Sequence, residues 1–383
     1  MRDVAIVGAD MVPFGKHRDL SLAGLAGPAV IGALRAAGAE RADIDAVYSG
    51  NVTGGMLVGQ RIVSRLGLDG IPVVNVENAC SSSATALHEA YVAVAAGVHQ
   101  TVLVLGVEQL TALGGGPLPL DLADHEVANG QLMPAVYAMR ARRYLHEYGL
   151  TAADLAEVAV KARRHGALNP YAQIRTPTTV EEVIGSRPVA SPLTLFQCCP
   201  NGDGAAALVV TAAENASRFD APPVRIRASV LHSGRFETGF RDMTSPQITV
   251  DGAAHAYEQA GIGPGDVDVI ELHDAFTIAE LLYYEAFGLA KPGEAMALLR
   301  SGATTFGGRT VVNPSGGLLA KGHPIGATGA AQAVEIVWQL TGRAGARQVT
   351  GARIGITHAT GGGMSGVDHG ACTIHVLEAM QAR

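Results

Sequence analysis

One cysteine lies in a sequence context that suits nucleophilic catalysis. Cys80 follows the apolar run VVNV and opens the small-residue stretch SSSATA, so we expect it between a strand and the first turn of a helix. The free N–H groups and the dipole at a helix start lower the pKa of a thiol and can also bind an oxyanion. Cys80 is therefore a candidate nucleophile, and a buried structural cysteine is the alternative.

Three histidines lie in turn sequences that suit the same chemistry. His323 lies in NPSGGLLAKGHPIGATG, His273 in ELHDAF and His358 in GITHATGGG. Gly362 and Gly363, which follow His358, leave backbone N–H groups free to form an oxyanion cradle. A single histidine at a strand end is more often structural, but three histidines together with one cysteine favour nucleophilic catalysis.

The elements that must position these residues follow an α/β pattern. Short β-branched runs alternate with small-residue helical stretches, which is typical of strands covered by helices on both faces. The predicted strands are 4–7, 46–48, 73–76, 102–105, 205–210, 267–272, 354–357 and 373–377. The predicted helices are 21–38, 82–96, 134–147, 152–166, 277–287 and 327–340.

Two stretches of the chain read alike and suggest an internal duplication. VVNVENACSSSATALHEA and VIELHDAFTIAELLYYEA each run as strand, polar turn and helix. A duplicated α/β half would bring two such turns face to face across one interface, where polar groups can converge. A Gly/Pro-rich stretch interrupts the first half. We therefore divide the chain into an N-terminal half (1–110 plus 192–220), an inserted cap (111–191) and a C-terminal half (221–383).

Composition and charge argue against several classes of function. A net charge of -7 gives no basic field for nucleic acid. Cys80, Cys198, Cys199 and Cys372 form no C-x-x-C pair, which argues against a metal site and favours a reducing compartment. The chain begins on a predicted strand, and its longest apolar stretch, 90–98, is too short to cross a bilayer. We predict a soluble cytoplasmic protein that binds neither metal, nucleic acid nor membrane.

The motifs NACSS (78–82), HDAF (273–276), GHP (322–324) and TH (357–358) occur in the order expected of thiolases. The chain resembles the thiolase superfamily over essentially its whole length, and it is most similar to the archaeal-type and sterol-carrier-protein-x-like acetyl-CoA acetyltransferases. This resemblance implies a five-layer αβαβα fold with an inserted loop domain. It also implies a homodimer or homotetramer, coenzyme A as substrate, no tightly bound cofactor, and a possible small partner protein with a zinc ribbon and an OB fold.

The resemblance also implies roles for the candidate residues. Cys80 would take the acyl group, while His323 would activate the thiol and polarise a thioester carbonyl. His273 would replace the family's water-holding asparagine. The N–H groups of Cys80 and of Gly362 or Gly363 would form an oxyanion hole. The reaction would be thiolytic cleavage of a 3-oxoacyl-CoA or the reverse Claisen condensation.

The chain departs from the family pattern where a proton donor is needed. Ala359 and Ala275 stand where relatives carry a second catalytic cysteine. His358 is our preferred acid/base, with Asp368 and His369 as weaker candidates. The departure leaves open a retro-aldolase or an acyl or condensing transferase acting on CoA thioesters. A non-catalytic acyl-CoA binding subunit is the third alternative.

Weaker signals lie outside these motifs. Arg140, Arg143 and Arg164 fall on the predicted cap helices and could meet the phosphates of coenzyme A, with a solvated helix face as the alternative. The adjacent pair Cys198 and Cys199 reads as structural, because neighbouring cysteines seldom bridge.

Overall fold

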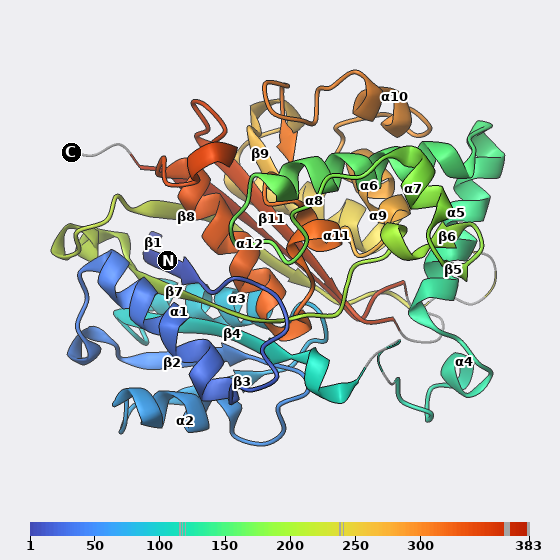
Figure 1. The fold of residues 1–383 in the computed structure, drawn as a ribbon. Helices are drawn as coiled ribbons and strands as arrows, with labels where there is room; N and C mark the ends of the chain where they lie inside the picture. Colours follow the sequence, from blue (N-terminus) through green and yellow to red (C-terminus); the bar gives the residue numbers. More distant parts are fainter. Residues whose placement is uncertain are drawn as a thin grey trace.

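The computed structural model describes residues 1–114, 116, 118, 120–236, 239, 241–363 and 368–380. Within them, a mixed sheet has the strand order β10-β9-β11-β12-β8-β1-β7-β4-β2-β3 (Figure 1). The strands are β1 (Val4–Met11), β2 (Ala46–Gly50), β3 (Val73–Val76), β4 (Thr101–Gln109), β7 (Asp203–Ala212), β8 (Val224–His232), β9 (Val269–Glu271), β10 (Val311–Val312), β11 (Ile354–Gly361) and β12 (Ala371–Ala379).

The sheet consists of two similar halves. At one edge β2 pairs in parallel with β3 and β4, and at the other β9 pairs in parallel with β10 and β11. Inside these parallel groups, β7 and β1 on one side and β12 and β8 on the other are antiparallel. The halves meet where β1 and β8 pair over two residues, Ala5 with Arg225 and Ile6 with Val224. The predicted duplication is therefore present.

The elements that correspond in the two halves differ from those that the sequence comparison matched. The order of strands makes β9 the counterpart of β2, not of β3, and β10 the counterpart of β3. The helix equivalent to α3 (Ser82–Ala95) is consequently α12 (Ile325–Leu340) rather than α9 (Thr277–Ala286). The strand, turn and helix pattern recurs several times in an α/β chain, so one matching spacing selected the wrong repeat.

Helices complete five layers. α3 and α12 pack against each other and contact strands of both halves, so they form the central layer. Every residue of α12 is buried, and most of them are apolar or small. The buried polar residues Gln332, Glu335 and Gln339 are hydrogen-bonded. α1 (Leu22–Ala37) and α2 (Val58–Val63) cover the outer face of the N-terminal half. α8 (Gln247–Ala260), with α9 packed on it, covers the outer face of the C-terminal half.

The segment between β4 and β7 leaves the sheet and lies over the C-terminal half (Figure 1). Its main helices, α5 (Met133–Tyr148) and α6 (Ala152–Ala167), pack against α9, and α6 also contacts α11 (Gly317–Lys321). The segment also contains α4 (His125–Ala128), α7 (Val180–Gly185), β5 (Pro188–Ala190) and β6 (Leu193–Thr194). A further helix, α10 (Ala295–Arg300), lies outside this segment and follows α9. The predicted limits of the cap, 111–191, remain a prediction.

None of the helices in the described ranges is both long enough and apolar enough to cross a membrane.

The turn between β3 and α3 is tightly constrained. Ala79 has φ 48°, a left-handed conformation that is unusual for a residue with a side chain. Ser82 Oγ holds the turn by donating to the carbonyl oxygen of Ala79 at 2.6 Å and accepting from the N–H of Asn78 at 3.0 Å. The end of β11 lies directly against this turn, and a Cβ added at Gly361 would overlap the carbonyl oxygen of Asn78.

We expect Gly361→Ala to lower the free energy of unfolding by about 1–3 kcal/mol, because the added methyl group must displace backbone in a closely packed region. Urea denaturation of the two proteins measures the difference. Gly185→Ala is the matched control, since a Cβ there meets no atom within 4 Å. Equal stability of the two variants would contradict the contact between β11 and the turn.

Candidate active site

Cys80, His273 and His323 converge in space. One atom from each, the sulfur of the cysteine and one ring nitrogen of each histidine, lies within 4.8 Å of the other two. The two imidazole rings meet edge to face, with centroids 5.0 Å apart. Cys80 lies two residues before α3 and His323 two residues before α12, so the two residues occupy equivalent places in the duplicated halves. His273 follows β9.

Two backbone N–H groups lie close to the thiol of Cys80. The N–H groups of Gly362 and of Cys80 itself favour the thiolate, and both lower the pKa of the thiol. Burial has the larger effect and raises the pKa of the Cys80 thiol to about 11. The expectation that the helix start lowers this pKa is therefore wrong for the free protein, because α3 begins only at Ser82 and the low-polarity surroundings dominate.

His323 is oriented as a proton acceptor. Its Nδ1 lies 2.8 Å from Thr328 Oγ1, and that hydroxyl donates its single proton to the carbonyl oxygen of Pro324 at 3.1 Å. The hydroxyl must therefore accept from Nδ1–H, which leaves Nε2 of His323 unprotonated. Burial, helped by the nearby ammonium of Lys321, lowers the pKa of His323 to about 3. The imidazole is neutral and can accept a proton from a thiol.

His273 presents a free polar atom at the site. Its side chain is 3% exposed, and its Nδ1 has no hydrogen-bond partner among the described residues. Burial, followed by the neighbouring imidazoles of His323 and His358, holds the pKa of His273 well below its usual value. A buried nitrogen without a partner is suited to bind water or a substrate atom.

His358 lies outside this cluster. Successive side chains of β11 point to opposite faces of the sheet. Ala359 lies on the side of the cysteine turn, where its carbonyl oxygen is 3.5 Å from Ser81 Oγ. The ring of His358 faces the outer helices: Nε2 is 3.1 Å from Thr249 Oγ1 in α8, and Nδ1 accepts from the N–H of His273 at 3.5 Å. With both nitrogens engaged, His358 supports the backbone of His273 and does not face the sulfur.

Asp368 and His369 precede β12, and Gly362 follows β11, the strand that pairs with β12. The N–H of Gly370 donates to the carbonyl oxygens of Gly361 and Gly362 at 2.9 and 3.2 Å. His369 Nε2 is 2.9 Å from the hydroxyl of Tyr137 in α5.

Tyr137 was not among the sequence candidates. Its ring stacks on Phe276 of the HDAF motif, with centroids 4.5 Å apart. The helical spacing of Tyr137, Ala141 and Tyr144 on the buried face of α5 was the available signal.

A second thiol also reaches the site. The N–H of Cys199 donates to the carbonyl oxygen of Ala275 at 2.9 Å. The backbone of Cys198 forms an antiparallel β-bridge with that of Phe276. Cys199 lies near enough to Cys80 for their charges to interact, and burial raises the pKa of Cys199 well above its usual value. These cysteines are far from the HDAF motif along the chain, so only the folded structure shows that they lie beside the HDAF turn.

The three candidate arginines do not form one cluster. Arg140 is 2% exposed and makes an ion pair with Asp368. Arg143 is exposed and pairs with Glu147 on its own helix at 2.8 Å. Arg164 is exposed on α6. Among the oxyanion candidates, Gly362 provides the N–H that reaches the sulfur, whereas Gly363 lies closer to Met133 and Asp368.

The cysteine and the two histidines offer two kinds of chemistry. One sulfur and two imidazole nitrogens could hold a zinc-like ion. The same atoms form a nucleophile with an adjacent base and a hydrogen-bonding group, next to two N–H donors that can stabilise an oxyanion. The two readings are separated by the sensitivity of activity to a metal chelator.

Comparisons with known proteins identify one family. The family model "Thiolase, N-terminal domain" matches residues 4–214, and "Thiolase C-terminal domain-like" matches residues 231–371. The benzoylsuccinyl-CoA thiolase subunit BbsB of Thauera aromatica is 44% identical, over 97% of this chain and 98% of its own. An acetyl-CoA acetyltransferase of Methanothermobacter thermautotrophicus is 42% identical, over 98% and 100%. Sterol carrier protein 2 of Gallus gallus is 37% identical, over 94% and 70%.

Solved structures show the same architecture. The Ltp2-ChsH2(DUF35) aldolase superposes with a TM-score of 0.86 at 29% identity, and the match covers 98% of each chain. Human mitochondrial 3-ketoacyl-CoA thiolase superposes with a TM-score of 0.75 at 18% identity over 99% of each chain, which supports the fold alone. The matched domains, the similar relatives and the convergent cysteine and histidines lead to one conclusion: the chain belongs to the thiolase family and is an acyl-CoA C-acyltransferase of that family.

Proposed function

We propose that Cys80 carries the acyl group during thiolytic cleavage of a 3-oxoacyl-CoA, or during the reverse Claisen condensation. The observation that carries the proposal is the convergence of the Cys80 sulfur with ring nitrogens of His323 and His273 within 4.8 Å. The enzyme needs a nucleophile, a base beside it and donors for the oxyanion, and all three lie in this small volume.

In the first half of the reaction, the sulfur of Cys80 attacks the C3 carbonyl carbon of the 3-oxoacyl-CoA. Nε2 of His323 takes the thiol proton, because its Nδ1–H is committed to Thr328. The oxygen that becomes negative is stabilised by the N–H groups of Cys80 and Gly362. The C2–C3 bond then breaks, leaving the acyl group on Cys80 and an enolate of the shortened acyl-CoA.

In the second half, the imidazolium of His323 gives its proton to the enolate, the shortened acyl-CoA leaves, and a new coenzyme A thiol attacks the acyl-Cys80 carbonyl. His323 receives the proton of that thiol and returns a proton to the Cys80 sulfur. His273, with its free Nδ1, binds the thioester oxygen on which enolate charge develops. Condensation uses the same groups in the opposite direction, with coenzyme A as a substrate and not as a tightly bound cofactor.

A homodimer or homotetramer is part of the proposal. β3 forms one edge of the sheet and is apolar in sequence, VVNV, yet Val74 is 42% exposed. Met56 and Leu57, which precede α2, and Val92 of α3 are also exposed. An exposed apolar edge strand is a natural site for pairing with a second copy. The Cys80 turn follows β3 directly, so this contact would border the active site.

A small partner protein and a cytoplasmic location complete the proposal. One relative is named as a subunit, and the similar aldolase structure contains two proteins, Ltp2 and ChsH2(DUF35). These names support a second chain. The family resemblance implies that this chain would have a zinc ribbon and an OB fold and would help to bind coenzyme A. The cytoplasmic location rests on the unpaired cysteines and on the absence of a membrane-spanning helix in the described ranges.

A retro-aldolase acting on a CoA thioester is the second candidate function. The aldolase structure is 29% identical to this chain, and Ala359 and Ala275 stand where a second cysteine was expected. Such a reaction needs no acyl-enzyme. The two functions are therefore separated by the requirement for Cys80.

Exposure to acetoacetyl-CoA should acylate the protein at Cys80, as detected by intact-mass and peptide mass spectrometry. Cys80→Ala should abolish thiolysis, and His323→Gln should lower kcat by roughly 100- to 10,000-fold through loss of the base. Cys198→Ala is the matched control, since the Cys198 thiol donates to Thr194 at 3.4 Å. EDTA should have no effect on thiolysis. Turnover of a side-chain aldol substrate by Cys80→Ala would establish the aldolase instead.

Alkylation of Cys80 by iodoacetamide should accelerate about tenfold per pH unit between about pH 7 and pH 9.5, without a plateau. The reason is that burial raises the pKa of the thiol to about 11, so the thiolate fraction keeps increasing over this range. The urea-unfolded chain is the control, and its rate should level near pH 9. A plateau around pH 7 in the folded protein would show a thiolate paired with an imidazolium instead.

A further inference from the structure

Two guanidinium groups, those of Arg140 and Arg241, lie near each other, and Arg140 is paired with the carboxylate of Asp368. Arg140 of α5 is almost fully buried, makes an ion pair with Asp368 and donates to the carbonyl oxygen of Met243 at 3.4 Å. Its Nε has no acceptor within the described ranges. Arg241, in the loop between β8 and α8, has a buried Nε and a buried Nη1 without hydrogen-bond partners among the described residues. Burial, with the positive charge of Arg241, lowers the pKa of Arg140.

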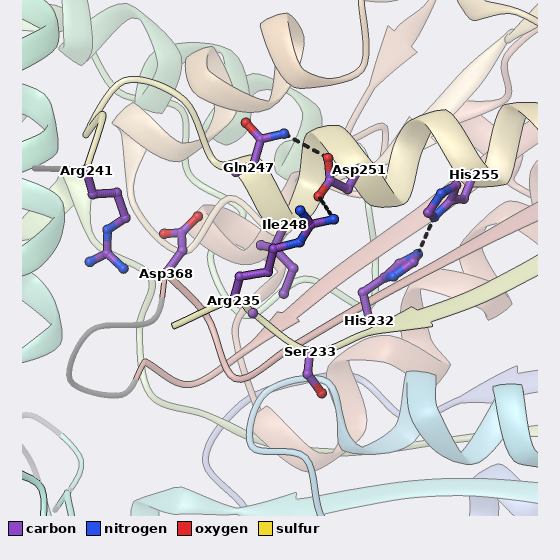
Figure 2. Close-up of a pocket in the computed structure, with 10 residues that line it drawn as sticks. His232, Ser233, Arg235, Arg241, Gln247, Ile248, Asp251, His255 and Asp368 are labelled. Carbon is purple, nitrogen blue, oxygen red and sulfur yellow. Dashed lines mark hydrogen bonds and ion pairs between the residues drawn. The ribbon is translucent and has the colours of Figure 1, made fainter. Parts of the chain in front are cut away.

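Among the described residues, the two arginines and Asp368 carry a net positive charge beside a small cavity. Arg241, Asp368, Ile248 and Gln247 are among the residues that line this cavity of about 60 Å³, and Figure 2 shows Arg241 and Asp368 side by side at one end of it. Arg235 differs from Arg241, because it makes an ion pair with Asp251 at 3.3 Å.

The neighbouring acid and the two lining histidines do not neutralise Arg241. The carboxylate of Asp242 is exposed and accepts from the N–H and the hydroxyl of Thr244, each at 2.8 Å. His232 and His255, at the other end of the cavity, hydrogen-bond to each other at 3.1 Å.

Arg140 is connected to the active site through Tyr137. Arg140 is positioned over the ring of Tyr137, 6.0 Å from its centroid, and Tyr137 stacks on Phe276 of the HDAF turn. Asp368 precedes Gly370, which is hydrogen-bonded to Gly362, a residue whose N–H lowers the pKa of the Cys80 thiol. A long pantetheine arm separates the thioester of coenzyme A from its phosphates. In the proposed function, a group beside the HDAF turn is therefore nearer to the acyl part than to the phosphates.

Buried guanidinium nitrogens without hydrogen-bond partners lower the stability of a protein, and the planar set of donors matches a carboxylate with two parallel hydrogen bonds. We propose that Arg241, with Arg140 behind it, binds a free carboxylate on the acyl part of the CoA thioester. The inference rests on the proposed function and extends it to a substrate class: acyl-CoA thioesters that carry a second, ionised carboxyl group.

The test compares substrates that differ only in this carboxylate. One pair is 3-oxoadipyl-CoA and 3-oxohexanoyl-CoA, and the other is 2-carboxymethyl-3-oxobutanoyl-CoA and 2-ethyl-3-oxobutanoyl-CoA. The wild-type enzyme should cleave the carboxylate member of at least one pair with the higher kcat/KM. Arg241→Gln should lower kcat/KM for that substrate by roughly 10- to 100-fold, the effect of losing a charged hydrogen bond, while the neutral member changes little.

Control variants separate charge from folding. Arg241→Lys should retain part of the preference, and Arg235→Gln, which changes an arginine that is 79% exposed on the same cavity, should retain all of it. The KM for coenzyme A should be unchanged in Arg241→Gln. The proposal is overturned if the wild type shows no preference in either pair, if the preference survives in Arg241→Gln, or if that variant raises only the KM for coenzyme A.

A binding measurement keeps the inference distinct from the proposed function. Calorimetry with the Cys80→Ala protein compares succinyl-CoA with butyryl-CoA, which lacks the carboxylate. Tighter binding of succinyl-CoA that is lost on adding Arg241→Gln supports the carboxylate site even if no 3-oxoacyl-CoA is cleaved. Equal affinities for the two ligands would refute it, and thiolysis of 3-oxohexanoyl-CoA by the wild type would still support the proposed function.

Discussion

Burial of a thiol among neutral imidazoles is the constraint on which the rest of the site depends. Low-polarity surroundings keep the proton on the Cys80 sulfur and keep His323 uncharged. The resting site is therefore a pair of neutral groups, and charge develops only when a substrate carbonyl is attacked. The N–H groups of Cys80 and Gly362 are fixed in place before that moment, so little reorganisation is needed to stabilise the new oxyanion.

A network of buried ionic groups supports the turns that carry the histidines. Lys321, two residues before His323, is paired with Glu271 at 3.3 Å, and Glu271 also accepts from the hydroxyl of Ser315 at 2.6 Å. Glu271 ends β9, two residues before His273. Buried pairs of this kind gain their stability from being fully hydrogen-bonded, and they fix the relative positions of the segments that they join. The ion pair of Lys321 with Glu271 thus helps to fix the distance between the turns that carry His323 and His273.

The sequence predicted the architecture well because the fold is encoded in local patterns. The strands and central helices lie within a few residues of the expected ranges, and motifs around Cys80, His273 and His323 predicted residues that the fold brings together. Side-chain direction was less accessible. The side chain of His358 faces the outer helices. The sequence could not predict this, because the face of β11 that covers the cysteine turn is set by how the layers assemble.

Long-range contacts were the part that the sequence could not provide. Tyr137 and Cys199 contact the HDAF turn from segments far from the motifs, and Arg241 lies near Arg140. Arg140 was expected to meet solvent or phosphate, yet it is buried against Asp368. The thiol pKa was also misjudged, since the number of N–H donors was visible in the pattern but the depth of burial was not. Such properties arise from packing across the whole molecule.

The equivalent positions of Cys80 and His323 have an evolutionary consequence. Each lies two residues before its central helix, in matching copies of one strand-turn-helix unit. A protein made of a single such unit could place two copies together only by associating with itself, and both turns would then carry the same residue. Fusion of the two copies into one chain removed that restriction. In the proposed function one turn carries the nucleophile and its twin carries the base, an asymmetry that a symmetric pair of identical units could not have.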